Sequence, residues 1–312
     1  MKGKRKKLLI AGAVLAVLLA VFFLVFWGFK YPFEASFIDV GQGDCALVVC
    51  DGKSMLIDGG NNGDGEKIAA YLKDRGIRRI DVLIATHPHS DHIGGLPYIV
   101  ENFEVKSAYI SPCVYTSKIY ESFLDALYEQ DIKTIAPKAG ESYELGGAEC
   151  RFVSSGSGYD DANNSSLVLR INYKDISVLF TGDIEAEAES RILESGEMLD
   201  CTLLKVAHHG SDTSSTEEFI KAVSPEIAVI SVGKGNSYGH PSQRVLERLE
   251  TVELRRTDLE GTIVYVSDGE SLMPEKRRGI YLGICSTGKL HSLCCLNRLS
   301  FQNIVPFFQR AW

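Results

Sequence analysis

The sequence predicts an α/β fold, a four-layer αββα sandwich behind one N-terminal transmembrane helix. Two observations predict it. Residues 8–29 contain no charged side chain, and residues 31–270 alternate twice between strand-like and helix-like segments. Because a sheet buries one face and a helix buries one stripe, two such halves are expected to pack as two sheets with helices outside.

The N-terminus has the composition of a membrane anchor. Residues 1–7, MKGKRKK, carry five positive charges, and the next 22 residues carry none. A helix needs about 20 apolar residues to cross a bilayer, and basic flanks stay in the cytoplasm. A cleaved signal peptide is the alternative, but its apolar region is shorter, about 7–15 residues. We therefore expect a single-pass protein of the cell membrane, anchored through residues 8–29, with an extracytoplasmic domain.

The first half of the sandwich is expected to begin with a strand and a hairpin. FEASFIDV (33–40) is the strand, and the turn DGK joins two strands within 45–58. IDVLIAT (80–86) is apolar throughout, which is typical of a strand buried on both faces. The other expected elements are helices over 65–76 and 117–130, a helix-like segment over 91–103 and a strand over 105–110.

The second half repeats this pattern. SSLVLRINY and DISVLFTGD form an apparent hairpin over 165–183, followed by an amphipathic helix over 184–196. CTLLKVAHHG (201–210) is expected to be a strand that runs into two histidines. The later expected elements are helices over 217–223 and 241–250 and strands over 227–232, 252–257 and 261–269.

These patterns divide the chain into three parts. They are a basic N-terminus with the anchor (1–30), the sandwich domain (31–270) and a tail (271–312). The tail is basic, contains three of the eight cysteines and shows no clear period, so we expect it to be poorly ordered. No C-x-x-C pair is present, which argues against a cysteine zinc site.

Residues 31–270 are strongly acidic. They contain 21 Lys and Arg against 40 Asp and Glu, a net charge of −19. Such a surface repels phosphate backbones unless a local basic groove or metal ions intervene. We therefore expect no strong binding of duplex DNA, while a small phosphoester or a single-stranded nucleic acid is allowed as substrate. The oligomeric state is left open.

The most specific motif is ATHPHSDHIGG, residues 85–95, which follows a buried strand. His87 and His89 are spaced by two, so their imidazoles can converge on one ion. Asp91 and His92 enter the next helix and can reach a second ion. Imidazole and carboxylate together suit zinc, manganese or iron. A metal site is favoured over surface or core histidines, because polar clusters at buried strand ends need partners.

The motif and its surroundings resemble the metallo-β-lactamase fold and, more closely, the soluble hydrolase-like domain of the ComEC competence proteins. The resemblance covers about residues 33–268 and implies that fold and a metal-dependent hydrolase. Since only one membrane segment is expected, the chain is expected to be a free-standing relative without the ComEC channel. Eight segments carry the resemblance in order: FIDVGQGDCALV, LIDGG, THPHSDHIGG, NNSSLVL, LFTGD, LKVAHHGS, YGHPS and RTDLEGTI.

The resemblance implies a set of metal ligands. Asp183, at the end of LFTGD, matches a carboxylate that bridges two ions in the family; the alternative is an N-cap of the following helix. His209 matches the metal ligand that the family supplies late in the sequence. His208 is the other candidate for this ligand, or it orients a ligand through its other nitrogen. The full expected set is His87, His89, Asp91, His92, Asp183 and His209.

Other candidate residues are less specific. His240 in YGHPS could contact substrate or metal, or could be a plain loop histidine while Ser242 caps the next helix. Gln42, Asp44 and Asp58 follow strands, and they could lie at the rim of the site. Tight-turn chemistry is the alternative for these three.

One departure from the wider fold concerns the ligand count. Many members supply a further histidine before the bridging aspartate, but this chain has none between His92 and His208. Asn163 or Asn164 could orient a water molecule there or make a turn. The expected cofactor is therefore one or two divalent ions, Zn or Mn.

The expected protein is a membrane-anchored, extracytoplasmic metal-dependent hydrolase. The first expectation for its activity is a phosphodiesterase, and a nuclease is one form that this activity could take. A divalent ion lowers the pKa of a bound water toward about 7, which supplies metal-bound hydroxide at neutral pH. Asp91, His208 and His240 are the expected catalytic side chains, and His208 or His240 would hydrogen-bond the departing oxygen.

Two alternatives of other classes remain open. One is a metallohydrolase of a different ester or amide, such as a phosphocholine-type ester or a lactam. The other is a non-catalytic binding module, against which the near-complete ligand set argues. Serine hydrolases, P-loop enzymes and dinucleotide-binding enzymes lack support, because no G-x-S-x-G, P-loop or G-x-G-x-x-G motif is present.

Overall fold

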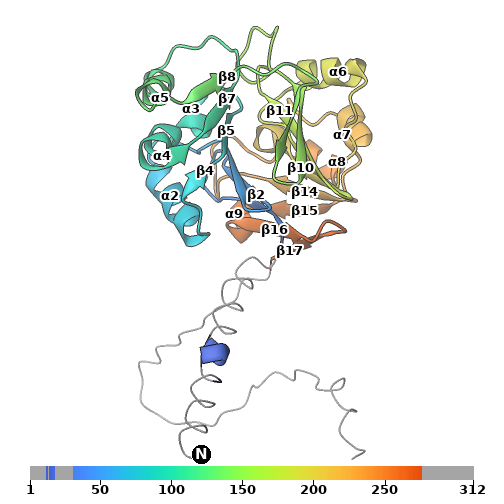
Figure 1. The fold of residues 1–312 in the computed structure, drawn as a ribbon. Coiled ribbons are helices and arrows are strands. Elements are labelled where there is room, and N and C mark those ends of the chain that lie inside the picture. The colour runs from blue at the N-terminus through green and yellow to red at the C-terminus, as the bar shows by residue number, and fades with distance from the viewer. Residues whose placement is uncertain (1–11, 13, 18–30, 276–312) are drawn as a thin grey trace, which may run out of the picture. The chain divides into compact units, whose positions relative to one another are not determined.

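Two β-sheets lie against each other in the middle of the domain, and helices cover both outer sides (Figure 1). The structure is a computed structural model that describes residues 12, 14–17 and 31–275. Residues 31–275 fall within one compact unit. The predicted mixed α/β fold with four layers is confirmed for this unit.

The first sheet has eight strands in the order β17-β16-β1-β2-β3-β5-β7-β8. Its strands from β17 to β3 pair antiparallel, and those from β3 to β8 pair parallel. A separate two-stranded sheet pairs β4 with β6. The bounds are β1 Phe33–Phe37, β2 Ala46–Cys50, β3 Lys53–Ile57, β4 Arg79–Ile80, β5 Val82–Ala85, β6 Glu104–Val105, β7 Ser107–Ile110, β8 Lys133–Ile135, β16 Ile263–Ser267 and β17 Leu272–Pro274.

The second sheet has seven strands in the order β15-β14-β13-β12-β11-β10-β9. Strands β9 to β12 pair antiparallel, and β12 to β15 pair parallel. The bounds are β9 Ser142–Leu145, β10 Ala148–Ser154, β11 Val168–Tyr173, β12 Ile176–Phe180, β13 Leu203–Lys205, β14 Ile227–Ile230 and β15 Glu253–Arg256.

Helices α2 to α5 cover the first sheet, and α6 to α8 cover the second (Figure 1). Three of them begin at capping residues. Ser117, Thr216 and Ser242 each accept a hydrogen bond from a backbone N–H in the first turn, which offsets an unpaired donor. The bounds are α2 Gly65–Asp74, α3 Ser90–Ile93, α4 Leu96–Asn102, α5 Lys118–Glu129, α6 Ala186–Ser195, α7 Glu217–Val223, α8 Gln243–Arg248, α9 Thr257–Glu260 and the 3₁₀ helix η1 Ala207–Gly210.

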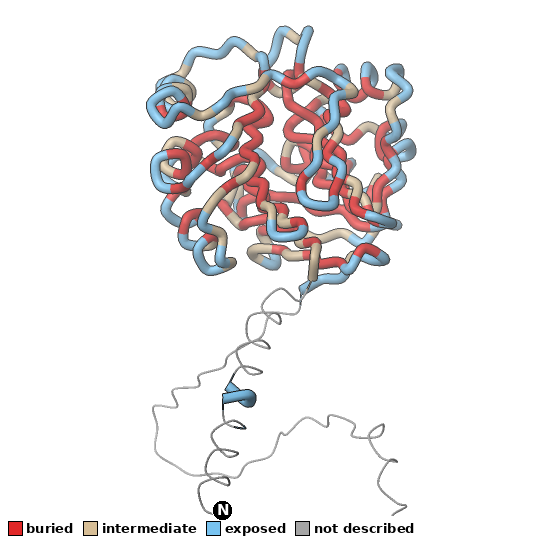
Figure 2. Tube along the Cα trace, in the orientation of Figure 1, coloured by how far each residue is buried: buried red, intermediate tan, exposed pale blue. Residues whose placement is uncertain are grey.

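The apolar core consists of three clusters, one between the sheets and one under each helical layer. Between the sheets, the rings of Phe37 and Phe180 stack with centroids 5.8 Å apart, and those of Phe33 and Tyr173 stack at 5.5 Å. Figure 2 shows that buried residues follow the strands and the inner sides of the helices. The core therefore gives the loops at the strand ends a rigid support.

The polar loops of the domain follow parallel strands. Strands β3 and β5 of the first sheet and β12, β13 and β14 of the second each end in a loop that carries buried polar side chains. In α/β sheets, ligands bind outside the carboxyl ends of parallel strands. This edge is where the predicted metal ligands are found.

The helix-like segment 91–103 is divided into α3 and α4 at Gly94 and Gly95. A Cβ at Gly94 would collide with the backbone of Asn61 and Asn62, which pass close by. The segment therefore bends where another loop packs against its backbone, a contact that helical spacing does not reveal.

Several strands were not predicted from the sequence. They are β8, β9 and β10, which lie between residues 133 and 154, and β17, which is the last strand of the described chain. Strands β8, β9 and β17 are short and lie at sheet edges, where few positions are buried and the apolar alternation is weak. The first sheet thereby extends past residue 270, and residues 276–312 lie outside the described residues.

The expected membrane anchor over residues 8–29 lies almost entirely outside the described residues. Within residues 12, 14–17 and 31–275, no helix has the length and apolar character needed to cross a membrane. A crossing needs about 20 apolar helical residues. This finding contradicts the predicted single-pass, extracytoplasmic location in the cell membrane. The five cysteines in the described ranges are free.

A core truncation tests the packing of the two sheets. Phe37→Ala should lower the free energy of unfolding by about 3–5 kcal/mol, because it leaves a cavity against Phe180. Leu259→Ala, at a side chain that is 71% exposed, should change it by less than about 0.5 kcal/mol. Urea denaturation followed by circular dichroism measures both; equal stability of the two variants would contradict this packing.

Candidate metal centre

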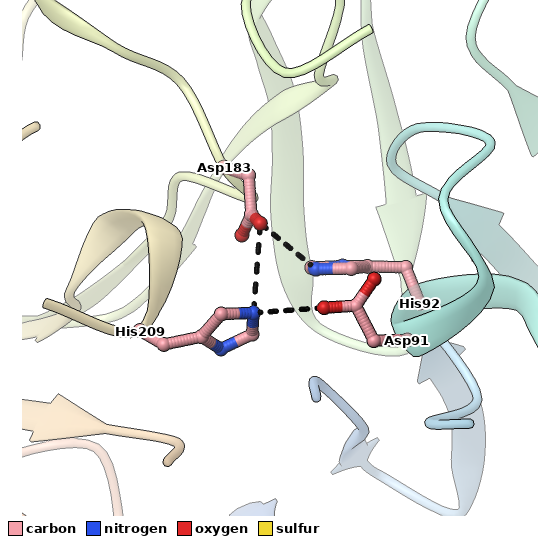
Figure 3. A group of neighbouring side chains, drawn as sticks. All are labelled: Asp91, His92, Asp183 and His209. Atoms are coloured by element: carbon pink, nitrogen blue, oxygen red, sulfur yellow. Dashed lines mark ion pairs between the residues drawn. The ribbon is translucent and has the colours of Figure 1, made fainter. Parts of the chain in front are cut away.

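Asp183 lies at the centre of a buried group of imidazoles (Figure 3). It follows the end of β12, and its carboxylate Oδ2 lies 3.2 Å from Nε2 of His92 and 3.5 Å from Nε2 of His209. The Nε2 atoms of His87 and His208 are each 3.9 Å from the same oxygen. One carboxylate therefore faces four histidines that come from two separate segments, the motif after β5 and η1 after β13.

Four residues of this group form the tightest set. Ligand atoms of Asp91, His92, Asp183 and His209 all lie within 4.8 Å of one another. Figure 3 shows the two imidazoles and the two carboxylates pointing toward a common centre. Nε2 of His209 is also 3.3 Å from Oδ2 of Asp91, so this imidazole lies between the two carboxylates.

His87 and His89 lie on the other side of His92. Nε2 of His87 is 3.1 Å from Nδ1 of His89, and the ring centroid of His87 is 4.1 Å from that of His92. His87 is buried, whereas His89 is partly exposed at the start of α3. The motif thus supplies two adjacent sets of ligand atoms, and Asp183 is close to both.

Asp58 orients His92 from behind. Its Oδ2 is 2.8 Å from Nδ1 of His92, and its two oxygens accept hydrogen bonds from the backbone N–H and the hydroxyl of Thr86. Because Nδ1 of His92 is engaged, Nε2 remains to face Asp183. Asp58 has a positive φ of 58°, a strained conformation that is typical of functional sites in non-glycine residues.

His209 is held by an unusual turn in η1. His208 and His209 both adopt left-handed conformations, with φ of 49° and 54°, and Gly210 follows with φ of 82°. A Cβ at Gly210 would lie 2.6 Å from the Cβ of Pro241, so only glycine fits there. Nδ1 of His209 donates to the carbonyl of Ser231 at 3.0 Å, which directs Nε2 toward the carboxylates.

A buried ion pair lies beneath His209. Nζ of Lys205 is 2.7 Å from Oδ2 of Asp44, and both side chains are less than 8% exposed. Oδ1 of Asp44 is 3.3 Å from Nδ1 of His209. The backbone N–H of Asp44 donates to the carbonyl of Asp91 at 3.0 Å. Gly43 permits this approach, because a Cβ there would lie 2.5 Å from that carbonyl oxygen.

The buried charges shift the pKa values of the histidines. Burial alone would lower the pKa of His92, but the carboxylates of Asp183 and Asp58 outweigh it and hold this pKa well above its usual value. Burial also opposes the charged form of His209, yet Asp183 and Asp44 raise its pKa to about 10. In the metal-free protein, the stability that His209 contributes is therefore present below pH 6.5 and lost as the pH rises toward 10.

The carboxylates shift in the opposite direction. Burial would raise the pKa of Asp183, but His92 and His209 hold it well below its usual range. For Asp44, the effect of burial is outweighed by Lys205 and His209, and its pKa falls to about 2. The stability that Asp44 contributes is therefore present above about pH 3.9 and lost as the pH falls toward 2.

The group fits a divalent cation. Within the described chain, four buried atoms of the cluster have no hydrogen-bond partner: Nε2 of His92, Nε2 of His209, Oδ1 of Asp183 and Oδ1 of Asp44. A buried polar atom without a partner is costly, and the first three face the centre of the cluster. Imidazole nitrogen with carboxylate oxygen is a ligand set for zinc or manganese. His92 and His209, together with Asp91 and Asp183, would hold one ion, while His87 and His89 would complete a second position at Asp183.

The remaining candidate histidines lie on a more open side of the cluster. His208 is 22% exposed, and its Nδ1 is 3.2 Å from Oε1 of Glu185. The ring of His240 lies 5.8 Å from that of His208 and is partly buried. Burial and the nearby His208 lower the pKa of His240. Both rings can reach a bound substrate, whereas neither belongs to the tightest set.

The alternative role of Asp183 as a helix cap does not hold. Helix α6 begins after Glu185, and the side-chain oxygen of Asn164 accepts hydrogen bonds from Glu185 N at 2.9 Å and Ala188 N at 3.1 Å. Asn164 therefore caps α6 from another loop, and the carboxylate of Asp183 stays free for the cluster. Asn163 donates to Glu185 instead of pointing to the histidines.

Sequence reasoning underrated three residues. Asp44 and Asp58 were assigned to turns or to the rim, but they lie buried behind the histidines, and Lys205 was not singled out. For Asp58 and Lys205, the available signal was a charged residue directly at the end of an apolar strand. Such a residue needs a partner, and the partner lies more than 30 positions away along the chain.

A surface hollow of about 740 Å³ lies elsewhere, between α7 and α8. Its lining alternates acidic and basic side chains, such as Glu217, Lys221, Glu247 and Arg248, and includes none of the cluster histidines. The histidine cluster is therefore the candidate site.

Known proteins resemble this chain in sequence. Residues 38–234 match the family described as the metallo-beta-lactamase superfamily. The chain is 32% identical to ComE operon protein 3 of Bacillus subtilis (strain 168) over 291 residues, 85% of this chain and 37% of that protein. It is 31% identical to competence protein ComA of Neisseria gonorrhoeae over 233 residues, 73% of this chain and 31% of that protein.

A solved structure agrees in fold. The metallo-beta-lactamase fold protein YhfI from Bacillus subtilis matches with a TM-score of 0.53 at 16% identity, covering 76% of this chain and 100% of that one. The chain spans about a third of the length of the two competence proteins. The resemblance inferred from eight sequence segments is thus confirmed.

Metal binding should depend on pH. In the metal-free protein, His92 and His209 carry protons at pH 7 because their pKa values are raised, and a divalent ion has to displace these protons. Binding of Zn²⁺ should therefore release protons near pH 7, and the affinity should increase from pH 6 to 9. Calorimetry in buffers of different ionisation enthalpy measures this release. A pH-independent affinity without proton release would contradict the assigned charges.

The role of Asp58 can be tested separately. Asp58→Asn removes the charge that orients His92 and should weaken Zn²⁺ affinity by about 10–100-fold. Asp74→Asn, at an exposed position on α2, is the matched control and should leave the affinity unchanged. Competition with a coloured chelator measures both variants. Equal affinities would show that Asp58 only closes a turn.

Proposed function

The chain belongs to the metallo-β-lactamase superfamily of metal-dependent hydrolases, and we propose that it hydrolyses phosphodiesters with one or two divalent ions, zinc or manganese. The observation that carries the proposal is the position of Asp183. Its Oδ2 lies within 3.9 Å of four imidazole nitrogens from two separate segments of the chain. A carboxylate so placed can serve two ion positions at once.

The chemistry needs a nucleophile and a way to offset negative charge. When bound, divalent ions would lower the pKa of a water molecule toward about 7 and offset the charge of a phosphodiester. His92 and His209 would bind through Nε2, because Asp58 and Ser231 already engage their Nδ1 atoms. Asp91, which is 30% exposed, is the ligand candidate best placed to accept a hydrogen bond from the attacking water.

His208 and His240 are proposed to act on the departing group. Both lie beside the cluster on its more open side, with ring centroids 5.8 Å apart. His240, whose pKa is lowered by burial, is neutral at pH 7 and can donate one hydrogen bond. A hydrogen bond to the departing oxygen stabilises the negative charge that develops there.

The choice of phosphodiester rests on charge and on the relatives. Two matched proteins are named for competence, and the resemblance to the ComEC hydrolase domain points to nucleic acid. The net charge of −19 over residues 31–270 opposes tight binding of duplex DNA. We therefore propose a small phosphoester or a single-stranded nucleic acid as substrate, with the ions supplying most of the attraction for phosphate.

A second hydrolase class is the alternative. A phosphocholine-type ester or a lactam would also fit a metal-held water. Lactam hydrolysis has less support, because no histidine between His92 and His208 completes the ligand set of the wider fold. A non-catalytic role has less support, because the described chain retains a near-complete set of metal ligands.

The test is hydrolysis by the purified chain, supplied with Mn²⁺ or Zn²⁺ after chelation. Bis-p-nitrophenyl phosphate, a single-stranded oligonucleotide and a chromogenic lactam are compared side by side. We expect turnover of the first two, and loss of that turnover in chelator. Turnover of the lactam alone would contradict the proposal and support the alternative.

Substitution of Asp183 gives the sharpest result. Asp183→Ala should lower the bound metal and reduce kcat by at least about 10³-fold, because both ion positions lose a ligand. His208→Ala should cost less, about 10–100-fold. Asp175→Ala, at an exposed turn, is the matched control and should keep full activity. Full metal content and turnover in Asp183→Ala would refute its bridging role.

A further inference from the structure

A row of aromatic and imidazole rings runs through the cluster from the exposed Tyr115 to the exposed Tyr238. The row contains every histidine in the described part of the chain. Successive ring centroids lie 5.5, 4.8, 4.1, 5.4, 6.1, 5.8 and 5.8 Å apart. In order, the rings are Tyr115, His89, His87, His92, His209, His208, His240 and Tyr238.

The two tyrosines come from different sheets. Tyr115 lies in the loop between β7 and α5 of the first sheet, and Tyr238 lies in the loop between β14 and α8 of the second. Tyr115 is 37% exposed and meets His89 edge to face. Tyr238 is 70% exposed and stacks on His240 with an interplanar angle of 10°. Each ring thus combines contact with a site histidine and a face open to solvent.

Packing does not account for the exposed rings. Tyr115 has one further ring neighbour, Tyr120, at 6.4 Å. Within the described residues, neither hydroxyl of Tyr115 and Tyr238 makes a hydrogen bond, so neither phenol ties its loop to the domain. The loop of Tyr238 is held instead by Asn236, whose Oδ1 accepts from the backbone N–H groups of Tyr238 and His240 at 3.1 Å.

Each tyrosine has an exposed lysine nearby in the same segment. Lys118 follows Tyr115 by three residues, and Lys234 precedes Tyr238 by four. Both lysines are exposed and make no ion pair with other described residues. In residues 31–270, whose net charge is −19, these two lysines near the tyrosines in sequence are local exceptions that can contact a phosphate backbone.

We propose that Tyr115 and Tyr238 are stacking platforms for the bases on either side of the scissile phosphate of a single-stranded nucleic acid. This inference rests on the proposed phosphodiesterase function and narrows its substrate class. Every base has a flat face, so stacking gives affinity without sequence preference. It also suits an acidic protein, because stacking does not depend on a positive surface.

The proposal makes a prediction about salt. Two lysine contacts to phosphates of a single strand give a slope of log affinity against log salt of only about −1.4. Binding that rests on stacking should therefore persist at salt concentrations that dissociate a protein with many phosphate contacts from its nucleic acid. A duplex buries its base faces and should bind far more weakly than a single strand.

The experiment uses the full chain with Mn²⁺ and two labelled 12-mers of equal charge, one of thymidines and one of abasic sites. Fluorescence anisotropy gives the dissociation constants, and gel analysis of the same samples gives hydrolysis. Tyr115→Ala and Tyr238→Ala should each weaken binding of the thymidine strand about tenfold and leave the abasic strand unchanged. Tyr115→Phe and Tyr238→Phe should bind as the wild type does, since the ring is kept.

Tyr128→Ala is the matched control, because Tyr128 is 86% exposed on α5 and is not part of the ring row. Equal binding of the two strands by the wild type, or equal losses on both strands in the alanine variants, would overturn the stacking role. Hydrolysis that survives such a result would leave the phosphodiesterase function standing. Selective binding of bases without any hydrolysis would support the platforms and refute the phosphodiesterase.

Discussion

The site depends on one constraint, the burial of the Asp183 carboxylate. A carboxylate that is 2% exposed has to be offset by positive charge or by hydrogen bonds. The backbone N–H of Asp183 donates to Oγ of Ser166, and its carboxylate faces the imidazoles of His92 and His209. Without metal, His92 and His209 must carry protons to balance it. When a metal ion is bound, the ion offsets the negative charge of the carboxylate in place of these protons. The burial of Asp183 therefore favours both the binding of a cation and a fixed arrangement of the ligand atoms.

The fold satisfies this constraint by bringing together the ends of parallel strands from two sheets. The loop after β12 supplies Asp183, the loop after β5 supplies the histidine motif, and η1 after β13 supplies His209. Behind them, Asp58 and the Asp44–Lys205 pair hold the imidazoles in place. The apolar cluster between the sheets anchors all three strands, so the ligand atoms can be placed without flexible supports.

Sequence reasoning predicted the layers and the histidine motif because both depend on local spacing. The apolar run of β5 and the spacing of His87 and His89 are visible in the chain itself. The role of Asp58 was not visible in the sequence, because its partner His92 lies 34 residues away. In sequence, an aspartate that orients a histidine cannot be told from one that only closes a turn. The same holds for Tyr115, whose ring neighbour His89 lies 26 residues away along the chain.

The central claim is that Asp183 organises a centre for divalent ions. The most direct measurement is anomalous diffraction at the zinc edge from crystals of the chain saturated with Zn²⁺. The account predicts one or two zinc peaks within about 2.0–2.2 Å of a carboxylate oxygen of Asp183, with Nε2 of His92 or His209 as a further ligand. Zinc bound only at other places, with Asp183 still facing protonated imidazoles, would contradict it.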